Sequence, residues 1–278
     1  MEIWNHFAFR TDSDPLTTKY TLDNGIICDL SETLCAVDIS ENDPRWRELE
    51  PILKAEKIFC LSETKFSKEE LYSAEWLTVI SRWLYDYPQP EDGYCGITYT
   101  EELLCLGRKG CGRELVQKNS FRFKKTPKWG RRNFCMTNWV YDEFFVSPKT
   151  KELLESSDLQ GFSFLPVYNK SGREVLADID QMQILHVLPE GIADFTACID
   201  GIYNCPVCGK RKYFTNGRGQ FVFKKEIFFD APDFVKSAER FGYGHIAARL
   251  ILVNQKAHRF ITSNKLDSSL VFEPICLV

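Results

Sequence analysis

Short segments in which apolar and polar residues alternate recur along the last two-thirds of the chain. Such alternation predicts strands, because successive side chains of a strand point to opposite faces of a sheet. The predicted strands are FRFKK (121–125), EFFVS (143–147), GFSFLPV (161–167), FVFKK (221–225), RLILV (249–253) and SLVFEPI (269–275). Helices are predicted over 148–157 and 255–264; Ser147 can cap the first of them, and Pro148 suits its first turn.

The same order of elements in both halves predicts an internal duplication. The segment 144–167 resembles 250–275, and at an offset of 107 Val146 falls on Val253 and Leu159 on Leu266. FRFKK matches FVFKK at an offset of 100, and further upstream Cys111-Gly112 corresponds to Cys208-Gly209. Ordered matches of this kind are typical of a repeated unit. The alternative is two unrelated α/β segments with common patterning.

The first 76 residues differ in character from the repeat. The predicted elements are a strand over 1–10 and helices over 43–58 and 67–87. Pro51 is expected to interrupt or end the first helix, since proline removes a hydrogen bond inside a helix. Ser67, with Glu70 three residues later, can form a capping box at the start of the second helix. A turn at Ser171-Gly172 and a following strand are expected to lead into the second repeat.

Composition indicates a globular chain. Of 278 residues, 44% are hydrophobic and 27% are charged, so the chain can bury a sizeable core. No apolar run approaches the ~18–20 residues that cross a bilayer. The N-terminus lacks the basic start and apolar stretch of a secretory signal. We therefore expect a soluble cytoplasmic protein without a membrane partner. The net charge of -4 argues weakly against a protein wholly devoted to nucleic acid.

Cysteine is the unusual residue, with eleven copies. An odd number without a secretory signal is poorly suited to a disulfide framework. In a reducing compartment, closely spaced cysteines more often bind metal, and scattered ones usually pack in the core. The sequence Cys205-Pro-Val-Cys208-Gly has the tight spacing of a zinc knuckle.

If the repeat is real, it selects Cys105 and Cys111 as the second pair of ligands. Two thiolate pairs can complete one tetrahedral shell, so we predict one structural zinc per chain held by four cysteines. The first pair has five intervening residues instead of two, and Arg108 occupies the place of a regular partner. Either this loop is expanded and Cys105 still ligates, or the site has lost a ligand and its metal. Substitute ligands are Cys95, His186 and His245.

The two Cys-Gly motifs resemble the double-CXXCG motif family of bacteria. The resemblance rests on Cys111-Gly112 and on the segment 205–209, with support from the closing segment 266–274, and it covers the last two-thirds of the chain. Members of that family are linked to immunity proteins that protect a cell from its own contact-delivered toxin. The resemblance therefore implies a non-enzymatic protein that binds and neutralises a toxin.

A second hypothesis comes from charge. Residues 108–132 carry ten Lys or Arg and one acid, and residues 209–225 carry six Lys or Arg and no acid. Both tracts contain aromatic residues, so they suit a zinc-ribbon protein that binds nucleic acid by phosphate contacts and base stacking. The simpler interpretation is lysines pointing outward from amphipathic strands. Residues 1–50, with eleven acids and four bases, could pair with these tracts or face a basic toxin.

Motifs of common enzyme classes are absent from the sequence. It contains no Gly-x4-Gly-Lys-Ser/Thr, no Gly-x-Ser-x-Gly and no His-Glu-x-x-His. We therefore predict a non-enzymatic protein. The predicted fold is α+β: two related units, each a zinc knuckle with a strand-helix-strand and mostly antiparallel sheets, after an N-terminal α/β segment. The predicted domains are 1–76, 77–181 (knuckle Cys105/Cys111) and 182–278 (knuckle Cys205/Cys208).

Overall fold

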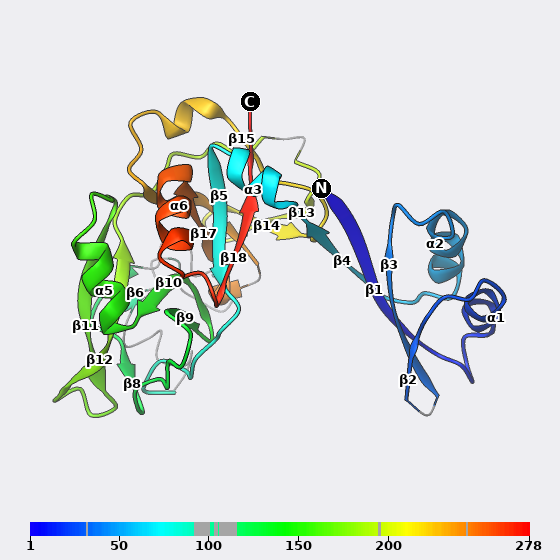
Figure 1. The fold of residues 1–278 in the computed structure, drawn as a ribbon, viewed down its shortest axis with the longest axis horizontal. Helices are drawn as coiled ribbons and strands as arrows, with labels where there is room; N and C mark the ends of the chain where they lie inside the picture. The colour runs from blue at the N-terminus through cyan, green and yellow to red at the C-terminus, as the bar shows by residue number, and fades with distance from the viewer. Residues whose placement is uncertain (32, 92–100, 103–104, 106–115, 194–195, 243) are drawn as a thin grey trace.

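The computed structural model describes residues 1–278 apart from 32, 92–100, 103–104, 106–115, 194–195 and 243. The described part mixes α and β structure with more strand than helix, which is compatible with the predicted α+β class. A smaller N-terminal unit projects to one side of a larger body (Figure 1).

The N-terminal unit is a four-stranded sheet with two helices. Its elements are β1 (Glu2–Arg10), α1 (Pro15–Asp23), β2 (Asp29–Ser31), β3 (Leu34–Ser40), α2 (Trp46–Ala55) and β4 (Cys60–Lys65). The strand order is β2-β3-β1-β4, and β1 is antiparallel to both of its neighbours. The helix α2 packs Trp46, Leu49 and Leu53 against Phe7 and Phe9 of β1. The predicted strand over 1–10 is confirmed.

Two expectations for the first 87 residues are wrong. Pro51 lies inside α2, which continues to Ala55 because the buried face of this amphipathic helix packs on the sheet. The helix predicted over 67–87 ends early: α3 spans only Lys68–Ser73, and Trp76–Ser81 form strand β5. β5 is almost entirely buried between two other strands, an environment that suits its apolar and β-branched residues.

The capping box at the start of α3 is confirmed. The amide of Glu70 donates to the Ser67 hydroxyl over 3.2 Å, and the amide of Ser67 donates to the Glu70 carboxylate over 2.8 Å. The local signal for a helix start was therefore correct, although the helix is short.

The body contains the remaining elements. They are β6 (Glu101–Glu102), β7 (Val116–Gln117), β8 (Arg122–Phe123), β9 (Phe134–Thr137), β10 (Val140–Val146), α5 (Pro148–Glu155), β11 (Phe162–Asn169), β12 (Val175–Ile184), β13 (Ile199–Asn204), β14 (Arg211–Thr215), β15 (Val222–Phe223), β16 (Phe234–Phe241), β17 (Ala248–Asn254), α6 (Gln255–Ser263), β18 (Leu270–Pro274) and β19 (Cys276–Leu277). Two short 3-10 helices span Lys225–Phe228 and Gly244–Ile246. The helices and strands predicted between 121 and 275 all have counterparts, although β8 and β15 are only two residues long.

The two large sheets of the body share one arrangement. One has the order β8-β11-β12-β10-β9 and the other the order β13-β14-β16-β17-β5-β18. Within them, β11-β12-β10-β9 corresponds to β18-β5-β17-β16. With the halves divided at residue 172, one inner strand of each set comes from the opposite half. β12 of the second half lies between β10 and β11, and β5 of the first half lies between β17 and β18. Each half therefore lends one strand to the other half's sheet.

The registers of the two sheets agree in the segments before the bulges that interrupt the β9–β10 and β16–β17 pairs. Phe145 faces Gln181 and Cys135, and its counterpart Leu252 faces Thr78 and Val235. The short parallel pairs agree as well, since β8 joins the end of β11 as β15 joins β19. This correspondence supports the predicted duplication. The predicted domain boundaries after residues 76 and 181 fall inside β5 and β12, the two exchanged strands.

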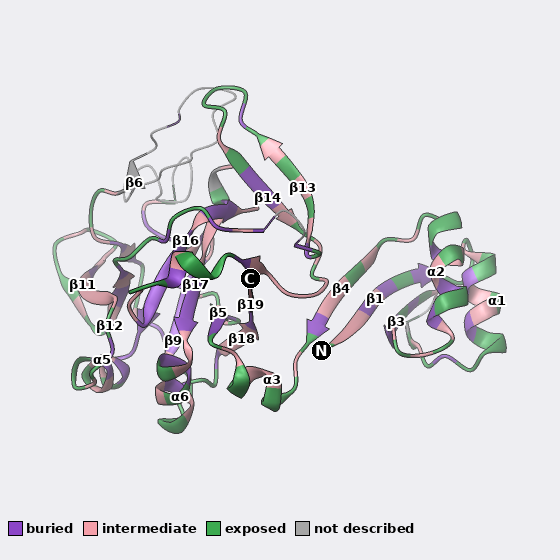
Figure 2. Ribbon diagram, turned by 90° about the horizontal axis from the view of Figure 1, so that it is seen from above, coloured by how far each residue is buried: buried purple, intermediate pink, exposed green. Residues whose placement is uncertain are grey.

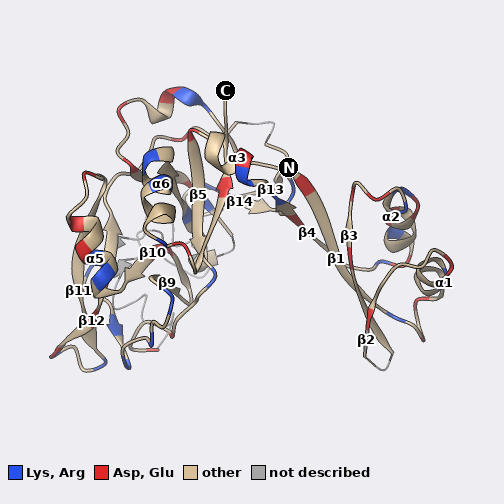
Figure 3. Cartoon of the chain, in the orientation of Figure 1, with Lys and Arg blue, Asp and Glu red and all other residues tan. Residues whose placement is uncertain are grey.

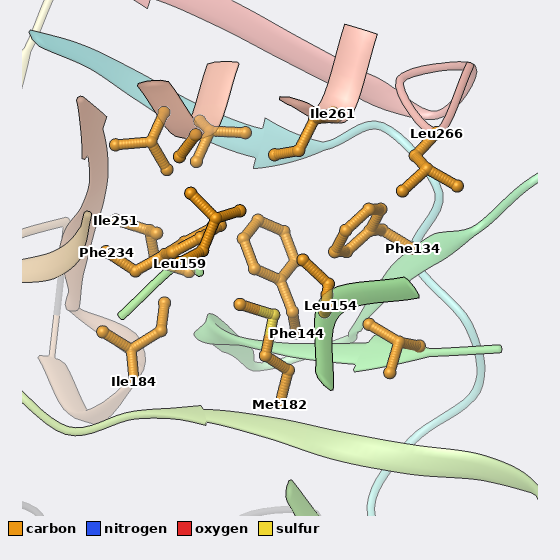
Figure 4. Close-up of a cluster of buried hydrophobic side chains, with 14 of the residues drawn as sticks. Phe134, Phe144, Leu154, Leu159, Met182, Ile184, Phe234, Ile251, Ile261 and Leu266 are labelled. Atoms are coloured by element: carbon orange, nitrogen blue, oxygen red, sulfur yellow. The ribbon is translucent and has the colours of Figure 1, made fainter. Parts of the chain in front are cut away.

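The main core lies where the two sheets and their helices meet. Figure 4 shows side chains from both halves in one cluster, with Phe134 and Phe144 beside Ile261 and Leu266. Leu154 of α5 and Ile261 of α6 occupy matched positions and are both 1% exposed. The predicted role of these helices, to cover the sheets with an apolar face, agrees with this packing.

Two cysteines of the N-terminal unit depart from the expectation of reduced, scattered thiols. Cys28 and Cys35 form a disulfide that joins the segment before β2 to β3, with their Cα atoms 5.6 Å apart. Disulfides are uncommon in cytosolic proteins. The expectation of a cytoplasmic location therefore stays a prediction.

Candidate metal centre

A two-stranded hairpin presents the Cys-x-x-Cys-Gly motif. β13 and β14 pair in antiparallel fashion, and the turn between them holds Cys205 and Cys208. The turn is closed by backbone hydrogen bonds from Cys205 to Lys210 (3.0 Å) and from Gly209 to Cys205 (2.8 Å). Gly209 has a φ of +71°, a conformation that favours glycine. The glycine after Cys208 is therefore explained by the backbone of the turn.

Three cysteines come together at this turn. The sulfurs of Cys105, Cys205 and Cys208 all lie within 4.8 Å of one another, and the Cys105 and Cys205 sulfurs are 3.8 Å apart. In a tetrahedral site with Zn–S bonds of ~2.3 Å, two sulfurs are ~3.8 Å apart. The group could therefore hold a metal ion without rearrangement of the Cys105–Cys205 pair.

The cluster is protected on one side and accessible on the other. Cys105 and Cys205 are buried, whereas Cys208 is exposed. Tyr203 of β13 packs against the two buried sulfurs, a contact that no spacing in the sequence indicated. Lys210, Arg211 and Lys212 follow the turn directly. The ammonium of Lys212 donates to the carbonyl of Gly244.

The structure brings three of the four predicted ligands together. Cys111, the fourth, lies outside the described residues, as do Cys95 and the side chain of His245. Of the substitute ligands, His186 is described; it is exposed and is not a member of the cluster. The residue that the repeat selected over a distance of 100 positions, Cys105, does meet the hairpin.

Cys135 and Cys198 are buried thiols that lie outside the cluster. Cys135 is fully buried on β9 among apolar residues, and burial raises the pKa of its thiol. Burial also raises the pKa of Cys198, to about 12. Both thiols therefore remain protonated near neutral pH. These two are packing cysteines, as expected for scattered ones.

The aromatic residues of the two basic tracts are mostly part of the core. Phe121 and Phe123 are fully buried, and Tyr213 is 4% exposed. They cannot stack on bases, because their rings pack inside the body. Trp129 and Phe214 are only half-buried. The simpler interpretation, in which lysines point outward from apolar strands, fits Phe121 and Phe123, with Lys124 and Lys125 exposed after them.

The N-terminal unit docks beside the same hairpin. The loop after β14 inserts Gly217 against β4, where a Cβ atom would lie 2.0 Å from the carbonyl oxygen of Ser62. Thr64 donates a hydrogen bond to Gly217 and accepts one from Gly219. Arg218 forms an ion pair with Glu41. The acidic N-terminal segment thus pairs with a basic tract at this point, and Figure 2 shows β4 reaching toward the hairpin.

Comparison with known proteins gives no relative. No family model matches the chain, and no curated protein matches it significantly in sequence. Among the described residues, no helix combines the length and apolar character needed to span a bilayer.

Proposed function

We propose that this chain is a non-enzymatic zinc-binding protein whose metal centre is structural. Cys105, Cys205 and Cys208 supply three thiolates, and Cys111 is the predicted fourth ligand. The observation that carries the proposal is the convergence of three sulfurs within 4.8 Å from segments 100 residues apart. Thiolate sulfur is a preferred ligand of Zn²⁺, and four-thiolate sites are typically closed and structural.

The centre would link the hairpin to the chain that follows β5. Cys105 precedes the first sheet in sequence, whereas Cys205 and Cys208 belong to a hairpin of the second sheet. A metal bound by both segments stabilises the fold, because the ligands are dispersed in the unfolded chain. A closed shell leaves no position for a substrate, in keeping with a binding role rather than catalysis.

The binding role that we propose is that of an immunity-type protein that neutralises a toxin. This role rests on the resemblance to the double-CXXCG motif family. We propose the N-terminal sheet as the binding face, since Leu34, Ala36 and Leu61 are exposed there and Asp38 and Glu63 flank His6. An apolar centre beside acidic groups suits a basic protein partner, and the charge would speed association.

Metal analysis of the purified chain tests the first part. We expect about one zinc per chain, lost in Cys205→Ser and in Cys208→Ser. Cys276→Ser, which removes an exposed thiol outside the cluster, is the matched control and should keep its metal. Mass spectrometry under non-reducing conditions tests the competing chemistry. A disulfide between Cys105 and Cys205 in the purified protein, with no metal bound, would overturn the metal centre.

Co-purification from a producing strain and a toxin-protection assay test the second part. The variant Asp38→Lys/Glu63→Lys reverses the charge of the proposed face, and we expect it to slow capture of a basic partner. Loss of protection with zinc content unchanged would separate the binding face from the metal centre. No partner and no protection would count against the immunity role. Salt-dependent retention on single-stranded DNA would instead support the nucleic-acid hypothesis.

A further inference from the structure

A basic cavity lies at the start of α5. Its volume is about 510 Å³, which lies in the range of ~300–1,000 Å³ typical of ligand pockets. It is formed by the segment before β9, the start of α5 and the loop between α6 and β18. Four of its lining residues are cations: Arg131, Arg132, Lys149 and Lys265. No lining residue is acidic, and within the described residues none of the four cations has an ion pair. Figure 3 shows Lys and Arg on α5 and on the chain leading to β9.

The other half of the molecule contains the same construction with its charge neutralised. Lys256 occupies the second position of α6, as Lys149 does in α5. Lys256 forms ion pairs with Asp158 (3.1 Å) and Asp233 (3.7 Å). Asp233 directly precedes β16, as Asn133 directly precedes β9. The backbone carbonyl of Asp233 accepts the amide of Asn254 over 3.1 Å, and the backbone carbonyl of Asn133 accepts the amide of Ser147 over 3.2 Å.

Neither acid has an acidic counterpart around Lys149. The repeat offset that places Leu159 on Leu266 places Asp158 on Lys265, and Asn133 stands where the second half has Asp233. Lys149 therefore shares its cavity with Lys265 and a neutral amide instead of two carboxylates. Asp267, the nearest acid along the loop, lines a different cavity with His258. Lys256 is thus neutralised by two carboxylates, whereas Lys149 lies among cations without an acidic partner in the cavity.

The backbone around the cavity is held in place. The Ser268 hydroxyl donates to the carbonyl of Arg131 over 2.6 Å, and the Asn133 amide group donates to the carbonyl of Lys265 over 3.4 Å. The Arg132 guanidinium lies 4.4 Å from the ring centre of Trp83, and this cation–π contact orients the guanidinium group. Like charges held together repel each other, and a cation in the first turn of a helix opposes the helix dipole. An anion in the cavity would relieve both effects.

From this arrangement we infer a binding site for a phosphate-bearing ligand. Guanidinium groups match the oxygens of phosphate with two parallel hydrogen bonds, and lysines add point charges. Four cations around one cavity suit a ligand with one or two phosphate groups. The site is separate from the cysteine cluster, so it does not depend on the metal.

Titration calorimetry at low salt with two probes tests the inference. The probes are inorganic pyrophosphate and a short single-stranded DNA. We expect binding to weaken about tenfold or more in Lys149→Glu/Lys265→Glu, because each lost charge-assisted hydrogen bond is a large part of the affinity. Lys19→Glu/Lys170→Glu changes the net charge equally at exposed lysines outside the cavity and should bind as the parent does.

A second variant copies the compensated half. Asn133→Asp/Lys265→Asp gives Lys149 the two carboxylates that Lys256 has, so it should abolish binding while thermal unfolding shows an intact fold. Pyrophosphate that binds at least as tightly as DNA would identify a small phosphate ligand, and tighter DNA binding through the same residues would identify a phosphodiester. Absence of binding by both probes, or equal binding by parent and cavity variants, would overturn the inference.

Discussion

The two sheets of the body have the same strand pairing but differ in what surrounds it. Their registers agree at every matched pair that the two ladders share, and both helices start at a capped residue, Ser147 or Asn254. Their charges do not agree: Lys236 and Glu143 form a buried ion pair where the matched residues are Met136 and Leu250. Backbone pairing and core volume thus tolerate a change of side-chain chemistry. Differences between the halves are therefore the places to look for function.

The largest effect should follow from separating the halves. Fragments 67–172 and 173–278 each lack the strand that fills the middle of their own sheet, so neither should unfold cooperatively alone. The expected loss is the whole stability of the body, ~5–15 kcal/mol for a typical protein. Circular dichroism with thermal unfolding measures it, and mixing the fragments should restore the transition.

Fragment 1–66 is the matched control for that separation. Its four-stranded sheet receives no strand from the body and has its own core around Phe7, Leu49 and Leu53. It should therefore fold alone. A cooperative transition in 173–278 without its partner would show that the exchanged strand β5 is dispensable.

The next effect concerns the buried ion pair. Lys236→Met leaves the Glu143 carboxylate buried without its cation, which typically costs ~3–5 kcal/mol of unfolding free energy. Lys236→Met/Glu143→Leu copies the apolar residues of the other half and should recover most of that loss. Urea unfolding of the parent and both variants measures the difference. A double variant as unstable as the single one would mean that the two halves are not interchangeable here.

Helix caps should give a smaller effect. Ser147 accepts the amide of Thr150 over 3.2 Å, and Asn254 accepts the amide of Ala257 over 3.0 Å. Replacement of either by alanine should lower the unfolding free energy by ~1 kcal/mol. Each cap side chain makes one further hydrogen bond, Ser147 with the Thr150 hydroxyl and Asn254 with Asp233, so the two losses should be similar. Ser263→Ala, at the exposed end of α6, is the control, and equal losses for all three variants would contradict the capping role.

The smallest expected effect is a difference in pH response. His258 of α6 is 2% exposed and packs on Phe272, and burial lowers its pKa. The matched residue of α5 is Lys151, which lies over Phe164 and forms an ion pair with Asp180. As pH falls through the usual histidine range, the unfolded chain binds the proton more readily, so stability should decrease. His258→Gln should reduce this decrease in unfolding measured from pH 7 to 5, and an unchanged slope would assign it elsewhere.

The sequence predicted the local parts of the fold well. Strands 140–146 and 248–254, and the helices after them, follow from alternation, helical spacing and caps, all of which act over a few residues. β5 was predicted as helix because the Ser67–Glu70 capping box indicates the start of a helix, and the apolar residues that follow are compatible with a helix or a strand. Only its position between β17 and β18 makes that run a strand. The Cys28–Cys35 disulfide was missed for a related reason, since their proximity depends on the pairing of β2 with β3.

The sequence alone determined the tight turn at Cys205 and Cys208, the two capped helices and the order of the helices and strands after residue 121. The tertiary structure alone decided that the halves exchange a strand, that Tyr203 packs on the buried sulfurs, and that four cations gather at one cavity. The reason is physical: caps, turns and alternation are set by neighbours along the chain, whereas strand exchange, metal geometry and charge compensation depend on residues that are brought together only when distant segments pack.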